Sequence, residues 1–210
     1  MKHSIVMVLM LGSFGGLTAQ TNNEIKIGEQ QWMANDLAII KFRNGDKIKQ
    51  AQTLKSWERA IKTKTPAWCY YEDNKNEPKD TFPRAILYNR FAISDSRGLA
   101  PDGWRLPTVR DFENLAQELG GEDSVGKKIK SKSGWDNDEN GNDILGFRAY
   151  PRGVLNGGGG WFEGKGRYVF WWSIDTNKIV GIDYSSNSLR FISEESNTGG
   201  CSVRCIKKNS

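Results

Sequence analysis

The residues with the clearest chemical potential lie in an acidic loop at residues 136–141, which reads DNDENG. Asp136, Asp138 and Asn140 stand at alternate positions, and the glycine that follows permits a sharp turn. Carboxylate and amide oxygens at this spacing can converge on Ca²⁺, as they do in the first half of an EF-hand loop. The bidentate glutamate that would complete such a loop is missing, because Phe147 stands at its position. Two interpretations therefore remain open, a calcium site with calcium as its cofactor and a solvated acidic turn between strands.

Trp161 and Phe162 form the second candidate site, because they follow a glycine-rich segment at residues 156–160. Aromatic rings that are exposed beside such a loop can stack on the apolar face of a sugar. Core packing is the competing interpretation, and it applies to most of the tryptophans. The glycine-rich segment has neither the G-x-G-x-x-G spacing nor the lysine of a phosphate-binding loop. We therefore predict ligand binding at Trp161 and Phe162 and no phosphate site.

The sequence contains one histidine, His3, and residues 21–210 contain none. Ser-His-Asp sites, Cys-His sites and histidine zinc ligands are therefore excluded from that part of the chain. No other nucleophile motif stands out. We expect a non-catalytic module that binds a glycan or a surface protein. The alternative is a hydrolase that acts on extracellular glycan through carboxylates.

Residues 1–20 have the pattern of a secretory signal peptide. Lys2 and His3 precede an apolar run at residues 4–17, and small residues follow before Gln20. The run is too short to span a bilayer comfortably, so we expect cleavage, export and no membrane-spanning segment afterwards. The net charge is +5, but the sequence has no long run of basic residues, so we expect no nucleic-acid partner. Residues 21–210 have a length that suits one domain with a single sizeable core.

The strongest structural signal lies at residues 97–121. A Pro-Asp-Gly turn precedes a short strand, and Thr108 then has the position of a helix N-cap with Asp111 as its capping-box partner. The helix should end at the two glycines 120–121. Its apolar face is expected to consist of Phe112, Leu115, Ala116 and Leu119. A second helix is expected after Thr53, with Leu54, Trp57 and Ile61 on one face.

Short motifs run in order along residues 21–210 and together carry a family resemblance. They lie at residues 27–37, 43–46, 68–71, 87–89, 97–121, 128–135, 146–147, 171–173 and 202–205. With these motifs the chain resembles the Fibrobacter succinogenes major paralogous domain, a family of bacterial secreted and envelope proteins. Arg90 departs from the family pattern, which usually has tryptophan there.

The resemblance implies an α+β, C-type-lectin-like domain with two helices, small twisted antiparallel sheets and long loops. Residues 105–108 are also similar to a segment of formylglycine-generating enzymes, but the paired active-site cysteines of those enzymes are missing, so that activity is not expected. Cys201 and Cys205 would lie about 13 Å apart in an extended strand, beyond the reach of a disulfide. The long-range bridge of C-type-lectin-like domains implies a Cys69–Cys205 disulfide, which would leave Cys201 unpaired.

Overall fold

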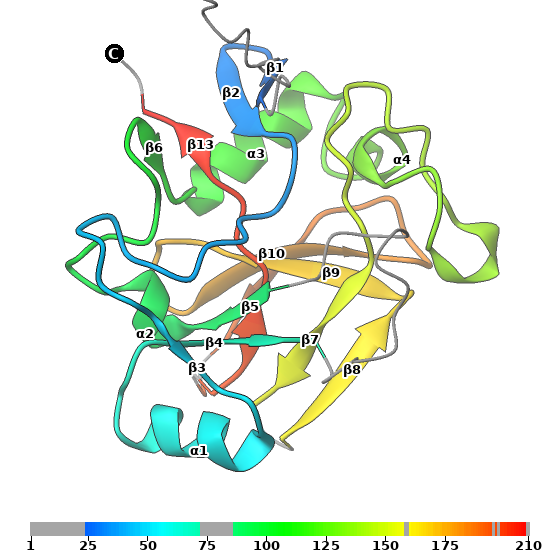
Figure 1. Ribbon diagram of the computed structural model, residues 1–210. Coiled ribbons are helices and arrows are strands. Elements are labelled where there is room, and N and C mark those ends of the chain that lie inside the picture. The colour runs from blue at the N-terminus through cyan, green and yellow to red at the C-terminus, as the bar shows by residue number, and fades with distance from the viewer. Residues whose placement is uncertain (1–23, 72–85, 158–159, 195, 197, 209–210) are drawn as a thin grey trace, which may run out of the picture.

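The computed structural model describes residues 24–71, 86–157, 160–194, 196 and 198–208 (Figure 1). The signal peptide expected at residues 1–20 lies outside this part of the chain. No helix among the described residues is long and apolar enough to cross a membrane.

Short strands in two sheets make up most of the regular secondary structure of the described residues (Figure 1). The four-stranded sheet has the order β1-β2-β13-β6, with β1 at Glu24–Ile27, β2 at Gln30–Met33, β13 at Ile206–Lys207 and β6 at Trp104–Arg105. The nine-stranded sheet has the order β11-β10-β9-β7-β12-β5-β4-β3, and β8 pairs with β7. Its strands are β3 (Lys49–Gln50), β4 (Ala67–Tyr70), β5 (Ile86–Asn89), β7 (Arg152–Asn156), β8 (Trp161–Lys165), β9 (Tyr168–Trp172), β10 (Lys178–Asp183), β11 (Arg190–Ser193) and β12 (Gly200–Cys201).

The helices of the described chain are few and short. They are α1 (Leu54–Lys62), α2 (Arg90–Ile93), α3 (Val109–Glu118) and α4 (Val125–Ile129), with a 3₁₀ turn, η1, at Asp136–Asp138. The expected α+β, C-type-lectin-like fold with two helices is wrong, because the described residues form thirteen strands in two sheets and only four short helices. Most strands have two to five residues, which is too short for an alternating pattern to stand out in the sequence.

The structure confirms the capping box that was predicted for α3. The Thr108 hydroxyl accepts a hydrogen bond from the Asp111 backbone N–H at 3.1 Å, and the Asp111 carboxylate accepts one from the Thr108 N–H at 2.7 Å. Arg105 donates to both carboxylate oxygens of Asp111, at 2.6 and 2.8 Å, and so ties β6 to the helix. Gly120 follows the C-cap with a φ of +94°, a conformation that favours glycine. The expected apolar face is buried, at Phe112, Leu115, Ala116 and Leu119.

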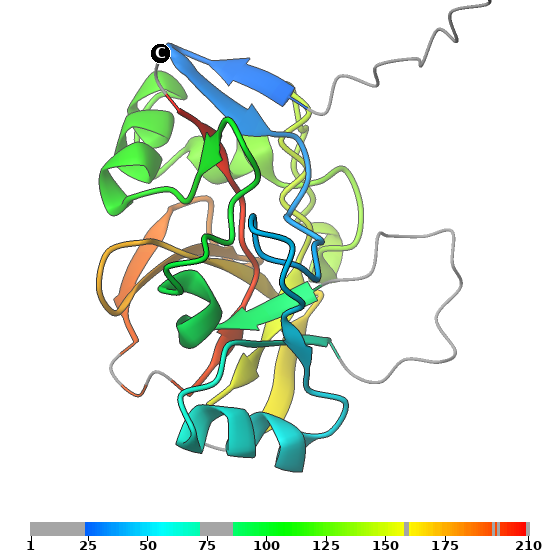
Figure 2. The same ribbon diagram turned by 60° about the vertical axis from the view of Figure 1, so that its left-hand side comes forward.

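Both faces of the large sheet are covered where β9 passes through the centre of the molecule. Trp171 packs with Phe112 of α3 in one cluster, and its neighbour Trp172 packs with Tyr88 of β5 in another. Neighbouring side chains of a strand point to opposite faces, so β9 separates these two clusters. A smaller third cluster surrounds Trp57 of α1. In Figure 2, α3 and α1 lie at opposite ends of the molecule.

The structure does not contain the expected Cys69–Cys205 disulfide. All three cysteines fall within the described residues, and all three are buried free thiols. Cys69 belongs to the cluster around Trp57, whereas Cys201 and Cys205 belong to the cluster around Tyr88. Burial raises the pKa of each thiol, to about 12 for Cys205. The thiols are therefore neutral at physiological pH and act as small apolar side chains.

Candidate functional site

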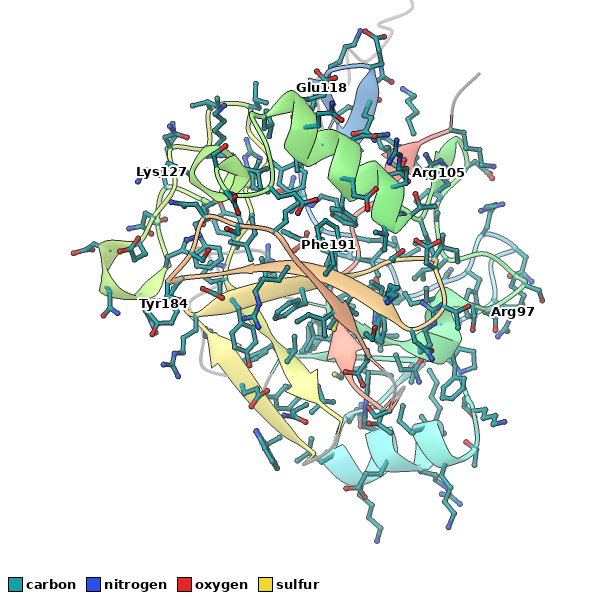
Figure 3. The ribbon with its side chains drawn as sticks, turned by 180° about the vertical axis from the view of Figure 1, so that it is seen from behind. Arg97, Arg105, Glu118, Lys127, Tyr184 and Phe191 are labelled. Atoms are coloured by element: carbon teal, nitrogen blue, oxygen red, sulfur yellow. The ribbon has the colours of Figure 1, made fainter. Side chains whose placement is uncertain are left out.

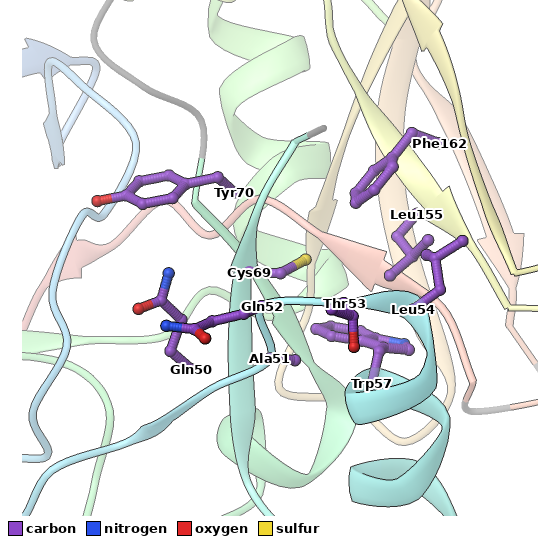
Figure 4. Close-up of a pocket in the computed structure, with 10 residues that line it drawn as sticks. All are labelled: Gln50, Ala51, Gln52, Thr53, Leu54, Trp57, Cys69, Tyr70, Leu155 and Phe162. Atoms are coloured by element: carbon purple, nitrogen blue, oxygen red, sulfur yellow. The ribbon is translucent and has the colours of Figure 1, made fainter. Parts of the chain in front are cut away.

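A pocket of about 460 Å³ lies beside α1 and is the best candidate for a binding site among the described residues (Figure 4). Three parts of the fold contribute to its wall: the segment from β3 into α1, strand β4, and the β7–β8 hairpin. Trp57, Tyr70 and Phe162 bring aromatic rings to this wall, and Gln50 and Gln52 bring amides. The residues that line it include no carboxylate, lysine or arginine. The pocket therefore offers rings and amide groups to an uncharged part of a ligand.

The start of α1 fixes one side of the pocket. Thr53 and Ser56 form a reciprocal capping box, so the helix begins at a defined residue and directs Trp57 inward. The Trp57 indole N–H donates to the Thr198 carbonyl at 2.9 Å. A Cβ on Gly200 would lie 2.9 Å from the Trp57 ring, so the ring packs directly on the backbone of β12. These contacts hold Trp57 rigidly in the pocket wall.

The wall has an apolar part and a polar part. Figure 4 shows Leu155 and Phe162 grouped with Trp57, while Gln50 and Gln52 lie together on the other side of β4, near Tyr70. The two glutamine side chains are exposed and make no hydrogen bond within the described part of the chain. Their amides are therefore free to donate to, and accept from, a bound molecule.

The structure brings only one of the two predicted ligand-binding residues to this pocket. Phe162 is half-buried, and its ring centroid lies 5.2 Å from that of Tyr71. Trp161 is 52% exposed and is not part of the pocket wall. Its indole N–H donates to the Glu163 carboxylate at 3.0 Å. Neighbouring residues of β8 point to opposite faces, which separates the two rings.

The acidic loop forms η1 and the residues that follow it. The Asn140 side-chain oxygen accepts a hydrogen bond from the Trp135 N–H at 3.1 Å, and Lys127 Nζ donates to the Asn140 carbonyl at 3.0 Å. No group of three or more histidine, cysteine, aspartate or glutamate side chains within the described residues could hold a metal ion. Asp136, Asp138 and Asn140 therefore have the surroundings of a solvated turn, and the calcium prediction gains no support from their geometry.

A buried ion cluster around Asp36 stands apart from the pocket. Arg204 Nη2 lies 2.6 Å from Asp36 Oδ1, and Arg152 Nε lies 3.0 Å from Oδ2. The Trp171 indole N–H donates to Oδ1 at 2.8 Å. Burial by itself raises the pKa of Asp36, but the charges of the two arginines and the donated hydrogen bonds outweigh it and hold the pKa below 3.8. Asp36 is therefore ionised and joins segments that are far apart in the sequence.

The lowered pKa of Asp36 gives an expected pH dependence. Its carboxylate contributes stability that is fully present above the unfolded-state value of about 3.8 and is lost as the pH falls through the lower folded-state pKa. The difference in unfolding free energy between the wild type and Asp36→Asn should therefore be constant near neutrality and shrink below about pH 3.8. Denaturant titrations at several pH values measure it, and a difference that grows on acidification would contradict this assignment.

Arg90, the departure from the family pattern, is accommodated by hydrogen bonds. Its guanidinium donates to three successive carbonyls that follow β9, those of Ser173 at 2.7 Å, Ile174 at 3.1 Å and Asp175 at 2.9 Å. A tryptophan has a single indole N–H and could not serve all three. The guanidinium also lies 5.7 Å from the Trp172 ring centroid. Arg90 is therefore a structural residue that stabilises the turn after β9.

Comparison with protein families gives a match to the Fibrobacter succinogenes major domain over residues 25–207. Searches of curated proteins and of solved structures found no match. The family match extends from β1 to β13, so it includes both sheets and every residue of the pocket wall. The chain thus belongs to the Fibrobacter succinogenes major domain family, as its sequence motifs indicated.

Proposed function

We propose that this protein is an exported, non-catalytic module that binds a glycan in the pocket beside α1. One observation carries the proposal: the same pocket wall contains aromatic rings and two glutamine amides that make no hydrogen bond within the described residues. Phe162 offers a half-buried flat apolar surface beside the buried Trp57, and Gln50 and Gln52 offer donors and acceptors. Sugars have both C–H faces and hydroxyl groups, so each part of the wall has a counterpart in the ligand. Export is supported by the signal pattern of residues 1–20.

The chemistry of the pocket favours binding over hydrolysis. Glycoside hydrolysis typically needs two carboxyl groups on either side of the scissile bond. The pocket wall has none, and its one thiol, Cys69, has a pKa that burial raises far above neutrality. An acid, a base or a nucleophile would therefore have to come from outside the wall.

Replacing Phe162 by alanine should weaken glycan binding at least about fivefold, since a stacking ring contributes on the order of 1 kcal/mol or more. Residues 21–210 would be applied to a glycan array, and the affinity for each bound glycan would be measured by calorimetry. Gln50→Ala and Gln52→Ala should each weaken the same glycans.

Trp161→Ala is the matched control, because Trp161 is the adjacent aromatic residue but lies outside the pocket. It should bind like the wild type. Unchanged affinity of the Phe162→Ala protein, with its thermal stability intact, would show that the pocket is not the glycan site. Release of reducing sugar from a bound glycan would favour the hydrolase instead.

A further inference from the structure

Positive charge is concentrated in residues 41–64, which lead through β3 into α1 and past its C-terminal end. This segment contains eight lysines and arginines against Asp46 and Glu58, so its net charge is +6, whereas the net charge of the whole sequence is +5. The rest of the chain is therefore close to neutral. Other residues separate these cations from one another, so the sequence shows no continuous basic run.

The cations of residues 47–64 are exposed and form no ion pair with another described residue. Among the described residues, no ion pair involves Lys47, Lys49, Lys55, Arg59, Lys62 or Lys64. All six are exposed. Asp46 is already paired with Arg97 at 3.1 Å, which leaves Glu58 as the one anion of residues 47–64. We call these six residues the basic surface.

The helical part of the basic surface lies on one face of α1. Lys55, Arg59 and Lys62 are separated by four and three residues, so their side chains share a face. The opposite face carries the buried residues Trp57 and Ala60. Side chains of α1 project into solvent at the lower end of the molecule in Figure 3. The cations are thus free to meet a large ligand.

The basic surface and the pocket share one segment of the chain. The segment from β3 into α1 carries both: Gln50 and Leu54 line the pocket, and Lys49 and Lys55 are their neighbours in the sequence. Neighbouring side chains point in different directions, so the lysines lie at the edge of the pocket and outside its wall. Long-range attraction between such a surface and a polyanion raises the association rate and weakens as salt is added. Trp57 and Ala60 of α1 are buried, and Leu54 is its one exposed large apolar side chain, so the helix has too little apolar surface to insert into a lipid layer.

We infer that the ligand of the pocket is an acidic polysaccharide. An uncharged ring face lies against Phe162, and carboxylate or sulfate groups of the same chain lie over Lys49, Lys55 and Arg59. This inference rests on the proposed glycan-binding function and narrows it to one class of glycan, since a neutral chain would leave the basic surface without a counterpart.

Dextran sulfate and dextran share a backbone and differ in charge, so they test the inference directly. The mature wild-type protein should bind dextran sulfate at least about tenfold more tightly than dextran, and the preference should shrink between about 50 and about 500 mM NaCl. Polygalacturonate, compared with its methyl ester, provides the carboxylate arm of the same test. The preference should appear with the sulfate, the carboxylate or both, and its absence from both pairs would overturn the inference.

The triple variant Lys55→Gln, Arg59→Gln, Lys62→Gln should lose at least about tenfold in affinity for the acidic chain. The control triple variant Lys26→Gln, Lys132→Gln, Lys208→Gln removes the same charge from exposed sites elsewhere and should lose less than about threefold. Equal losses in the two proteins would show that diffuse net charge, not the basic surface, attracts the chain.

Two further outcomes separate this inference from the proposed function. Equal affinity of the wild type for acidic and neutral chains, with both lost in Phe162→Ala, would keep the pocket and overturn the acidic preference. If duplex DNA or anionic vesicles bind as tightly as dextran sulfate, the basic surface binds polyanions in general. That result would overturn the inference that the ligand is an acidic polysaccharide.

Discussion

Replacing Asp36 by alanine should lower the unfolding free energy by about 3–5 kcal/mol, since it removes the buried counter-ion of Arg204 and one partner of Arg152. The side chains of Arg204 and Arg152 are 0% and 7% exposed, so water cannot replace the lost carboxylate. The Trp171 indole N–H loses its acceptor as well. The loss is a large fraction of the 5–15 kcal/mol that typically stabilises a domain. Denaturant titration at neutral pH measures it.

Asp46→Ala is the control for this experiment. Asp46 also accepts from an arginine, Arg97 at 3.1 Å, but this pair is exposed and solvent screens it. Its replacement should leave the unfolding midpoint almost unchanged. Similar shifts for the Asp36 and Asp46 variants would mean that the buried cluster contributes no more than an ordinary surface pair. If Asp36→Ala does not fold, Asp36→Asn keeps the shape and part of the hydrogen bonding and makes the loss measurable.

Replacing Trp171 by alanine should cost about 3–5 kcal/mol, as expected for a large aromatic side chain removed from a packed core. The Trp171 side chain is fully buried. Its ring stacks on Phe112 with centroids 6.0 Å apart and meets Phe147 edge-on at 5.8 Å. The cavity would open between β9 and α3, where rigid elements on both sides limit collapse.

Trp161→Ala removes the same side chain from an exposed site on β8 and provides the comparison. Its cost should stay below about 1 kcal/mol. Thermal and denaturant unfolding of both variants, followed by far-ultraviolet circular dichroism, give the two values. A Trp171→Ala protein as stable as Trp161→Ala would contradict the central position that the structure gives to Trp171.

Local signals in the sequence predicted the parts of the fold that local interactions determine. Thr108 and Asp111 are three residues apart, and their capping box formed as expected. The start of α1 at Thr53 was predicted for the same reason. The nine-stranded sheet was not predicted, because strands such as β12, with two residues, have no periodicity and depend on partners from distant segments.

The candidate site also contains residues that the sequence indicated and residues that it did not. Phe162 was identified because an aromatic pair beside a glycine-rich segment is conspicuous, whereas Gln50 and Gln52 look like ordinary surface residues. Trp57 was expected only as a core residue of its helix. Asp36 gave no signal, since its partners Arg152 and Arg204 are 116 and 168 positions away. Contacts of this range follow from the tertiary fold and leave no local pattern.

The placement of β12 and β13 has a consequence for the order in which the protein folds. β12 lies between β5 and β7 in the large sheet, and β13 lies between β2 and β6 in the small one. Neither sheet is continuous until residues 200–207 have taken their places, so a nascent chain that lacks them has two interrupted sheets. We therefore expect the domain to fold only after residues 200–207 have been synthesised, and to fold slowly because it depends on long-range pairing. A domain that stays unfolded until residues 200–207 have been made is also a suitable substrate for a translocation channel that accepts only extended polypeptide.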